Sequence, residues 1–102
     1  MNTIKIKGVE YQVEFNWNAI SDACAKLNCK PLRLISSVTE LDERELPIML
    51  HCGIVEGCRI AGVEYISFED FSKAARISTI GELMTIFSQQ NSMEVDEDAE
   101  KK

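Results

Sequence analysis

The chain has 102 residues, of which 45% are hydrophobic and 27% are charged, the composition of one folded globular domain. Seventeen acidic and eleven basic residues give a net charge of −6, and the basic residues do not cluster along the sequence. This balance repels phosphate and argues against a nucleic-acid partner. No apolar run approaches the roughly 20 residues of a membrane span, and the start lacks a secretory signal, so we expect a soluble, cytoplasmic protein without membrane contact.

Two short segments of alternating polarity open the chain. Ile4 and Ile6 alternate with lysines, and a second alternating run places Tyr11, Val13 and Phe15 on one face. A short turn with a glycine separates the two runs. This pattern predicts a β-hairpin whose apolar face must be covered by the rest of the domain, because a lone hairpin is marginally stable in water.

Helical spacing follows the hairpin. Asn16 or Asn18 can cap a first helix, since an asparagine side chain accepts hydrogen bonds from first-turn amides. Asn28 marks the end of this helix, and Pro31 is well placed to open a second, short one. The apolar stripe of the first helix consists of Trp17, Ile20, Cys24 and Leu27.

The longest apolar segment, residues 46–61, predicts the central helix. An acidic start signal, Asp42 with Glu45, precedes it, and Gly62 predicts its end. Pro47 lacks a backbone donor, so the helix is expected either to begin near Glu45 or to kink there.

The remaining elements are a helix opened by Ser67, with Phe68 and Phe71 turned inward, and a last helix opened by a capping box at Thr79. Residues 91–102 hold five acids and two lysines, which predicts a disordered acidic tail. We therefore expect an α+β fold: one domain over residues 1–90, with the N-terminal β-hairpin packed on a small bundle of about four to five helices.

The cysteines and the single histidine are the residues with chemical potential. The spacing of Cys24, Cys29, Cys52 and Cys58 lacks the tight pairs of zinc sites, so buried free thiols are expected, with no metal and no cofactor. A pair of His51 with one of three cysteines stays an alternative, and the sequence contains no catalytic motif. We therefore expect no enzyme.

The central helix is apolar over more than one stripe. The candidate interaction surface consists of Ile48, Met49, Gly53, Val55 and Gly57. Two glycines four residues apart permit close helix approach, and an open strand edge on the hairpin can pair with another chain. Core packing and self-association both explain this pattern, and the two can coexist.

Two segments resemble a known family. The hairpin segment TIKIKGVEYQVEF, residues 3–15, looks like the K-I-x-G-x-E-Y-x-x-x-F hairpin that opens phage tail assembly chaperones. The segment LPIMLHCG, residues 46–53, is similar to the Leu-x-x-Leu-x-x-x-Gly helix of that family. The resemblance covers residues 3–60, whereas residues 63–90 match no pattern of the family.

The resemblance implies a non-enzymatic assembly factor of a long-tailed phage or prophage, acting in the cytoplasm of the bacterial host. Such chaperones bind the tape measure protein, help tail tube subunits to polymerise, and form homo-oligomers. No site residue is implied by the resemblance. The alternatives are a small intracellular adaptor or regulatory protein–protein interaction domain, and a metal protein or enzyme that uses the cysteines and His51.

Overall fold

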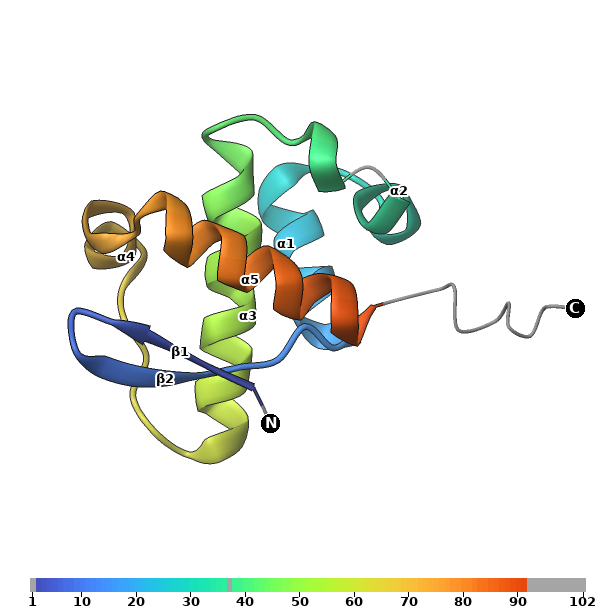
Figure 1. Cartoon of the computed structure of the whole chain (residues 1–102). Helices are drawn as coiled ribbons and strands as arrows, with labels where there is room; N and C mark the ends of the chain where they lie inside the picture. Colours follow the sequence, from blue (N-terminus) through green and yellow to red (C-terminus); the bar gives the residue numbers. More distant parts are fainter. Residues whose placement is uncertain (1, 37, 92–102) are drawn as a thin grey trace, which may run out of the picture.

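The computed structural model describes residues 2–36 and 38–91 of the chain. Figure 1 shows the arrangement, an N-terminal hairpin against a group of helices, which confirms the α+β prediction. The predicted tail lies outside the described residues, except for Asn91, which caps the last helix. The elements are β1 (Asn2–Ile6), β2 (Val9–Val13), α1 (Trp17–Leu27), α2 (Pro31–Ser36), a short 3-10 turn η1 (Val38–Glu40), α3 (Glu45–Ala61), α4 (Phe68–Ala74) and α5 (Ile77–Gln90).

The hairpin is closed by a two-residue turn. Lys7 and Gly8 both have positive φ angles, 53° and 80°, which is the type I′ geometry that matches the natural twist of two antiparallel strands. Ile6 pairs with Val9 directly beside the turn, and this sets the register of the strands. The side chains of Ile4 and Ile6 are buried, as the alternation predicts.

The central helix is α3, around which the other elements are arranged (Figure 1). The hairpin crosses the C-terminal half of α3, and α5 crosses it on the viewer's side. The N–H group of Glu14, just after β2, donates a 2.9 Å hydrogen bond to the carbonyl of Gly53 in α3. The core lies between α3, the hairpin, α1 and α5 and includes the fully buried side chains of Phe15, Leu50, Ile54 and Leu83.

Most helix ends follow the local signals in the sequence. The Asn16 side chain accepts a 2.9 Å bond from the amide of Ala19, and Asn28 ends α1 in the left-handed conformation. The Asp42 carboxylate accepts a 2.8 Å bond from the amide of Glu45, whose own carboxylate accepts from the amide of Asp42. The helix therefore begins at Glu45, and Pro47 falls in its first turn, where its missing donor is tolerated.

Three local predictions are wrong. The last helix begins at Ile77, two residues before the expected cap, and Thr79 is buried inside its first turn. The chain is extended only at Ala75 and Arg76 before it turns helical again, so no room is left for a later start. Trp17 and Phe68, expected in the core, are 62% and 40% exposed.

The end of α5 is fastened to the start of α1. The amide of Phe15 donates a 2.6 Å bond to the Gln90 side chain, and the Asn91 side chain donates a 3.1 Å bond to the carbonyl of Phe15. These bonds close the domain across 75 residues of sequence. Within the described ranges, no helix has the length and apolar character that crossing a bilayer requires.

Candidate interaction surface

Three of the five residues predicted for an interaction surface lie in the core. Met49 is completely buried, and a side chain added at Gly53 would overlap the ring of Phe15. A Cβ atom at Gly57 would lie 2.5 Å from backbone atoms of Gln12 in β2. The two glycines therefore permit close packing of the chain's own hairpin on α3, and the hairpin covers the face that the sequence offered to a partner.

The other two predicted residues line open hollows. Ile48 and Val55 are about two turns apart on α3 and are only partly buried. Ile48 lies in a hollow of about 710 Å³ and also, together with Val55, in a second of about 400 Å³. Both hollows include Lys26 and Phe68, so they adjoin one another. We call the combined feature the Ile48 groove.

The Ile48 groove runs along one side of α3. Its apolar lining comes from α1, from α3, from the chain between α3 and α5 and from α5 itself, and consists of Ala25, Leu27, Pro47, Ile48, Cys52, Val55, Tyr65, Phe68, Ala75 and Ile80. Tyr65 and Phe68 are 53% and 40% exposed, which leaves two aromatic rings partly in water. The charged residues of the groove are of both signs: Asp22, Lys26, Glu43, Arg44 and Glu45.

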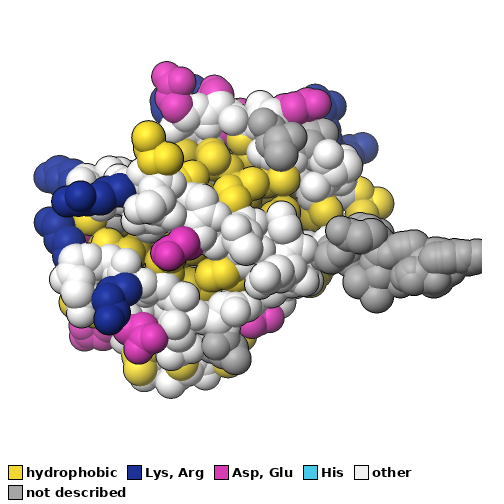
Figure 2. Space-filling model, viewed as in Figure 1, with side chains coloured by type: hydrophobic (Ala, Val, Ile, Leu, Met, Phe, Trp, Pro, Cys, Tyr) yellow, Lys and Arg dark blue, Asp and Glu magenta, His cyan; other side chains and the backbone are white. Residues whose placement is uncertain are grey.

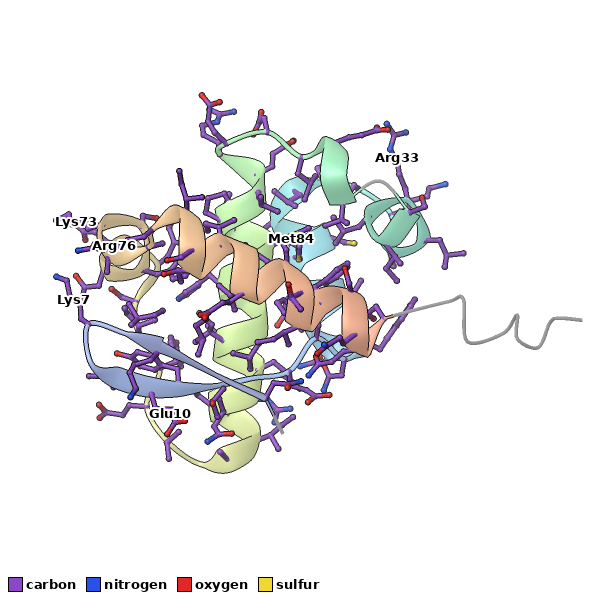
Figure 3. The ribbon with its side chains drawn as sticks, in the orientation of Figure 1. Lys7, Glu10, Arg33, Lys73, Arg76 and Met84 are labelled. Carbon is purple, nitrogen blue, oxygen red and sulfur yellow. The ribbon has the colours of Figure 1, made fainter. Side chains whose placement is uncertain are left out.

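Apolar surface also continues onto the face that carries α5. Figure 2 shows hydrophobic side chains gathered above α5, beside the segment that leads into α3. Met84 of α5, half-buried, lies on this side of the helix (Figure 3). Apolar surface therefore extends from the N-terminal half of α3 toward α5.

His51 lies beneath the groove and supports its wall. Its Nε2 atom donates a 2.6 Å hydrogen bond to the carbonyl of Ile66, and its ring contacts the rings of Tyr65, Phe68 and Phe71 at centroid distances of 5.5–6.2 Å. Burial lowers the pKa of His51, although the Ile66 carbonyl opposes that shift. A neutral histidine therefore holds the segment that carries the two exposed aromatic rings.

The cysteines are free thiols, and Cys29 alone is partly exposed. Burial raises the pKa of Cys24 and of Cys52 to about 11, and it raises the pKa of Cys58 as well. These three thiols are accordingly protonated near neutral pH, when they are weak nucleophiles and weak metal ligands. In the described part of the chain, no three residues among histidine, cysteine, aspartate and glutamate come together as a metal site would require.

A buried carboxylate on α3 was missed from the sequence. Glu56 is 2% exposed and accepts 2.8 Å bonds from the side-chain amides of Asn16 and Asn18, as well as bonds of 3.0 and 2.7 Å from Arg59. The Arg59 hydrogen bonds, helped by the two asparagines, lower the pKa of Glu56 to about 2. This network ties the start of α1 to α3. The sequence contained one signal for this buried carboxylate, namely a glutamate inside the apolar segment 46–61.

The fold also gathers basic residues that are separate in the sequence. Lys7, Lys73 and Arg76 lie at the same end of the molecule, near the tip of the hairpin and the junction of α4 and α5 (Figure 3). Lys73 forms a 3.3 Å ion pair with Glu69, and both side chains are largely exposed. This group is small and partly neutralised by Glu69. It would therefore bind phosphate much more weakly than a nucleic-acid surface, which makes many phosphate contacts.

Comparisons of the chain with known proteins found no match among family models, among curated proteins or among solved structures.

Proposed function

We propose that this protein is a non-enzymatic helix-binding protein, and that it acts as a tail assembly chaperone of a phage or prophage. The observation that carries the proposal is the Ile48 groove, an open apolar channel along α3. The proposed partner is an amphipathic helical stretch of the tape measure protein, with tail tube subunits as further partners. The proposed compartment is the cytoplasm of the bacterial host.

The form of the groove supports a helical partner. Ile48 and Val55 lie about two helical turns apart, the spacing at which an amphipathic helix repeats its apolar residues. A helix laid along α3 would present residues i, i+3 or i+4, and i+7 to the groove and would cover the exposed rings of Tyr65 and Phe68. Charges of both signs around the groove would then orient the bound helix.

The link to phage tails comes from the resemblance. A tape measure protein is long, helical and prone to aggregate, so a chaperone for it needs an apolar surface and good solubility. The Ile48 groove supplies the first, and the net charge of −6 supplies the second. The proposal assigns no catalytic residue and no cofactor.

The test is binding of a labelled helix. The probe is a fluorescein-labelled amphipathic peptide of about 20 residues taken from a tape measure protein, with a scrambled peptide of the same composition as its control. We expect fluorescence anisotropy to show saturable binding of the first peptide only. Ile48→Glu should weaken binding by about tenfold or more, because a carboxylate would face the apolar side of the helix.

Leu32→Glu is the matched control variant, since Leu32 is 74% exposed and lies outside the groove. It should bind the peptide as the unchanged protein does. Equal loss in both variants would contradict the assignment of the groove. Tight binding of unrelated amphipathic helices, with no preference for tape measure sequences, would instead favour the small adaptor protein.

A further inference from the structure

The outer edge of β1 has unused backbone hydrogen-bonding groups. In an antiparallel pair, residues alternate between those that bond to the partner strand and those that point away from it. The tight turn makes Ile6 and Val9 a bonded pair, so in β1 the main chain of Ile4 points toward β2 and that of Thr3 and Lys5 points outward.

Two bonds on the opposite edge confirm this alternation. The carbonyl of Gln12 accepts a 3.7 Å bond from the Cys58 thiol, and the amide of Glu14 donates to the carbonyl of Gly53. The main-chain N–H and C=O groups of the even-numbered residues in this segment therefore point toward α3. Since Thr3 pairs with Gln12, its main chain must face the other way. The edge of β2 is covered by α3, whereas no bond from the described residues reaches the outward groups of Thr3 and Lys5.

A hollow of about 450 Å³ accompanies the open edge. Its lining joins β1 to α5 and consists of Asn2, Thr3, Ile4, Lys5, Glu10, Glu82, Thr85 and Ile86. It shares no residue with the Ile48 groove. An added strand would therefore pair with β1 on one side and lie beside α5, without touching the proposed helix-binding surface.

We propose that this edge pairs with the β1 edge of a second copy of the chain, in an antiparallel four-stranded sheet with two-fold symmetry. One register within β1 pairs the outward groups of Thr3 and Lys5 in both copies. Ile4 must lie opposite Ile4 of the second copy, so that Thr3 faces Lys5 in both directions. Each Thr3 amide then donates to a Lys5 carbonyl, and each Lys5 amide donates to a Thr3 carbonyl.

Charge complementarity favours a second copy as the occupant. The Thr3 hydroxyl donates a 2.9 Å bond to the Glu10 carboxylate, which holds that carboxylate near β1 on the exposed face of the hairpin. In the proposed register Lys5 of the second copy lies opposite Thr3, next to this carboxylate, and the two-fold axis repeats the contact. No lysine faces the same lysine across the interface.

The first measurement is mass in solution by light scattering, from about 10 µM to about 1 mM, because small interfaces are weak and transient. We expect the dimer fraction to rise with concentration. Thr3→Pro should remain monomeric, since proline removes an outward donor that β2 does not use and is tolerated on an edge strand. Thr3→Val keeps the amide and should still dimerise. A monomer at every concentration, or a Thr3→Pro dimer of unchanged strength, would overturn the proposal.

A charge exchange gives a second, independent test. Lys5→Glu brings a second carboxylate up to that of Glu10 across the interface, and Glu10→Lys brings two ammonium groups together there. Each variant alone should therefore dimerise less than the unchanged chain. Mixed in equal amounts, with one variant labelled with ¹⁵N, the two should form a heterodimer in native mass spectrometry. Folded variants that form no heterodimer would overturn the proposal. Neither test uses a peptide, so failure of the helix-binding proposal would leave these results unaffected.

Discussion

The close contact between α3 and β2 predicts opposite effects for the same substitution at two glycines. Gly57 lies in α3 against the backbone of β2, where an added Cβ atom would be 2.5 Å from Gln12 and Val13. Gly81 lies in α5 with no atom within 4 Å of an added Cβ, so Gly81→Ala is the matched control for Gly57→Ala. Both glycines are inside helices, so the intrinsic gain from alanine is the same, about 1 kcal/mol.

The contact decides the sign at Gly57. Ordinary carbon contacts are about 3.5–4.0 Å, so β2 would have to move by about 1 Å. Backbone cannot rotate away as a side chain can, and β2 is held to α3 by the bonds at Gly53 and Cys58. We take about 3 kcal/mol for this overpacking, the upper part of the usual range. Gly57→Ala should therefore destabilise the fold by about 2 kcal/mol, whereas Gly81→Ala should stabilise it by up to about 1 kcal/mol.

Urea unfolding followed by circular dichroism measures both changes. Thermal melts should show a decrease of about 8–16 °C for Gly57→Ala and an increase of several degrees for Gly81→Ala. Equal stabilisation by the two substitutions would refute the packing of β2 on α3. Loss of self-association by Gly57→Ala without loss of stability would return Gly57 to the interface predicted from the sequence.

Three further predictions follow from the buried groups. The pKa of Glu56 is about 2 when folded against 4.5 for an ordinary glutamate, so its stabilisation is present above about pH 4.5 and is lost as pH falls toward 2. The free energy of unfolding should therefore decrease between about pH 4.5 and pH 2 in the unchanged protein. This decrease should be smaller in Glu56→Gln and should remain in the control Glu64→Gln. Met49→Glu should unfold the domain by circular dichroism, because an unpaired charge would be buried, whereas Ile48→Glu should stay folded. An NMR titration of His51, the single histidine, should give a midpoint below 6.5, and a midpoint at or above 6.5 would contradict its burial.

The sequence predicted those features that depend on neighbouring residues. Alternation identified both strands, and the glycine turn placed the hairpin. The helix caps lie at residues that the sequence indicated. Asn16 and Ser67 cap with their side chains, and Asn28 and Gly62 end their helices in the left-handed conformation. Each of these signals acts within about four residues, so an unfolded chain already contains the information.

The candidate surface was predicted only in part, because periodicity does not say which element covers an apolar face. The sequence showed that α3 is apolar on several sides, but Met49 and Gly53 face the core whereas Ile48 and Val55 face the groove. The groove also depends on Tyr65 and Phe68, from a segment in which the sequence suggested no site. Their rings are held there by His51, through the bond to the carbonyl of Ile66 fifteen residues away.

The sequence by itself determined the α+β class, the hairpin and the central helix, since hydrophobic periodicity and capping are local properties. The tertiary structure alone decided that Gly57 accommodates the hairpin rather than a partner, that Glu56 is buried with Asn16 and Asn18, and that the open strand edge belongs to β1. These outcomes depend on contacts between residues about 40 or more apart in the chain. Such contacts are selected by how the elements share one core, which no local pattern specifies.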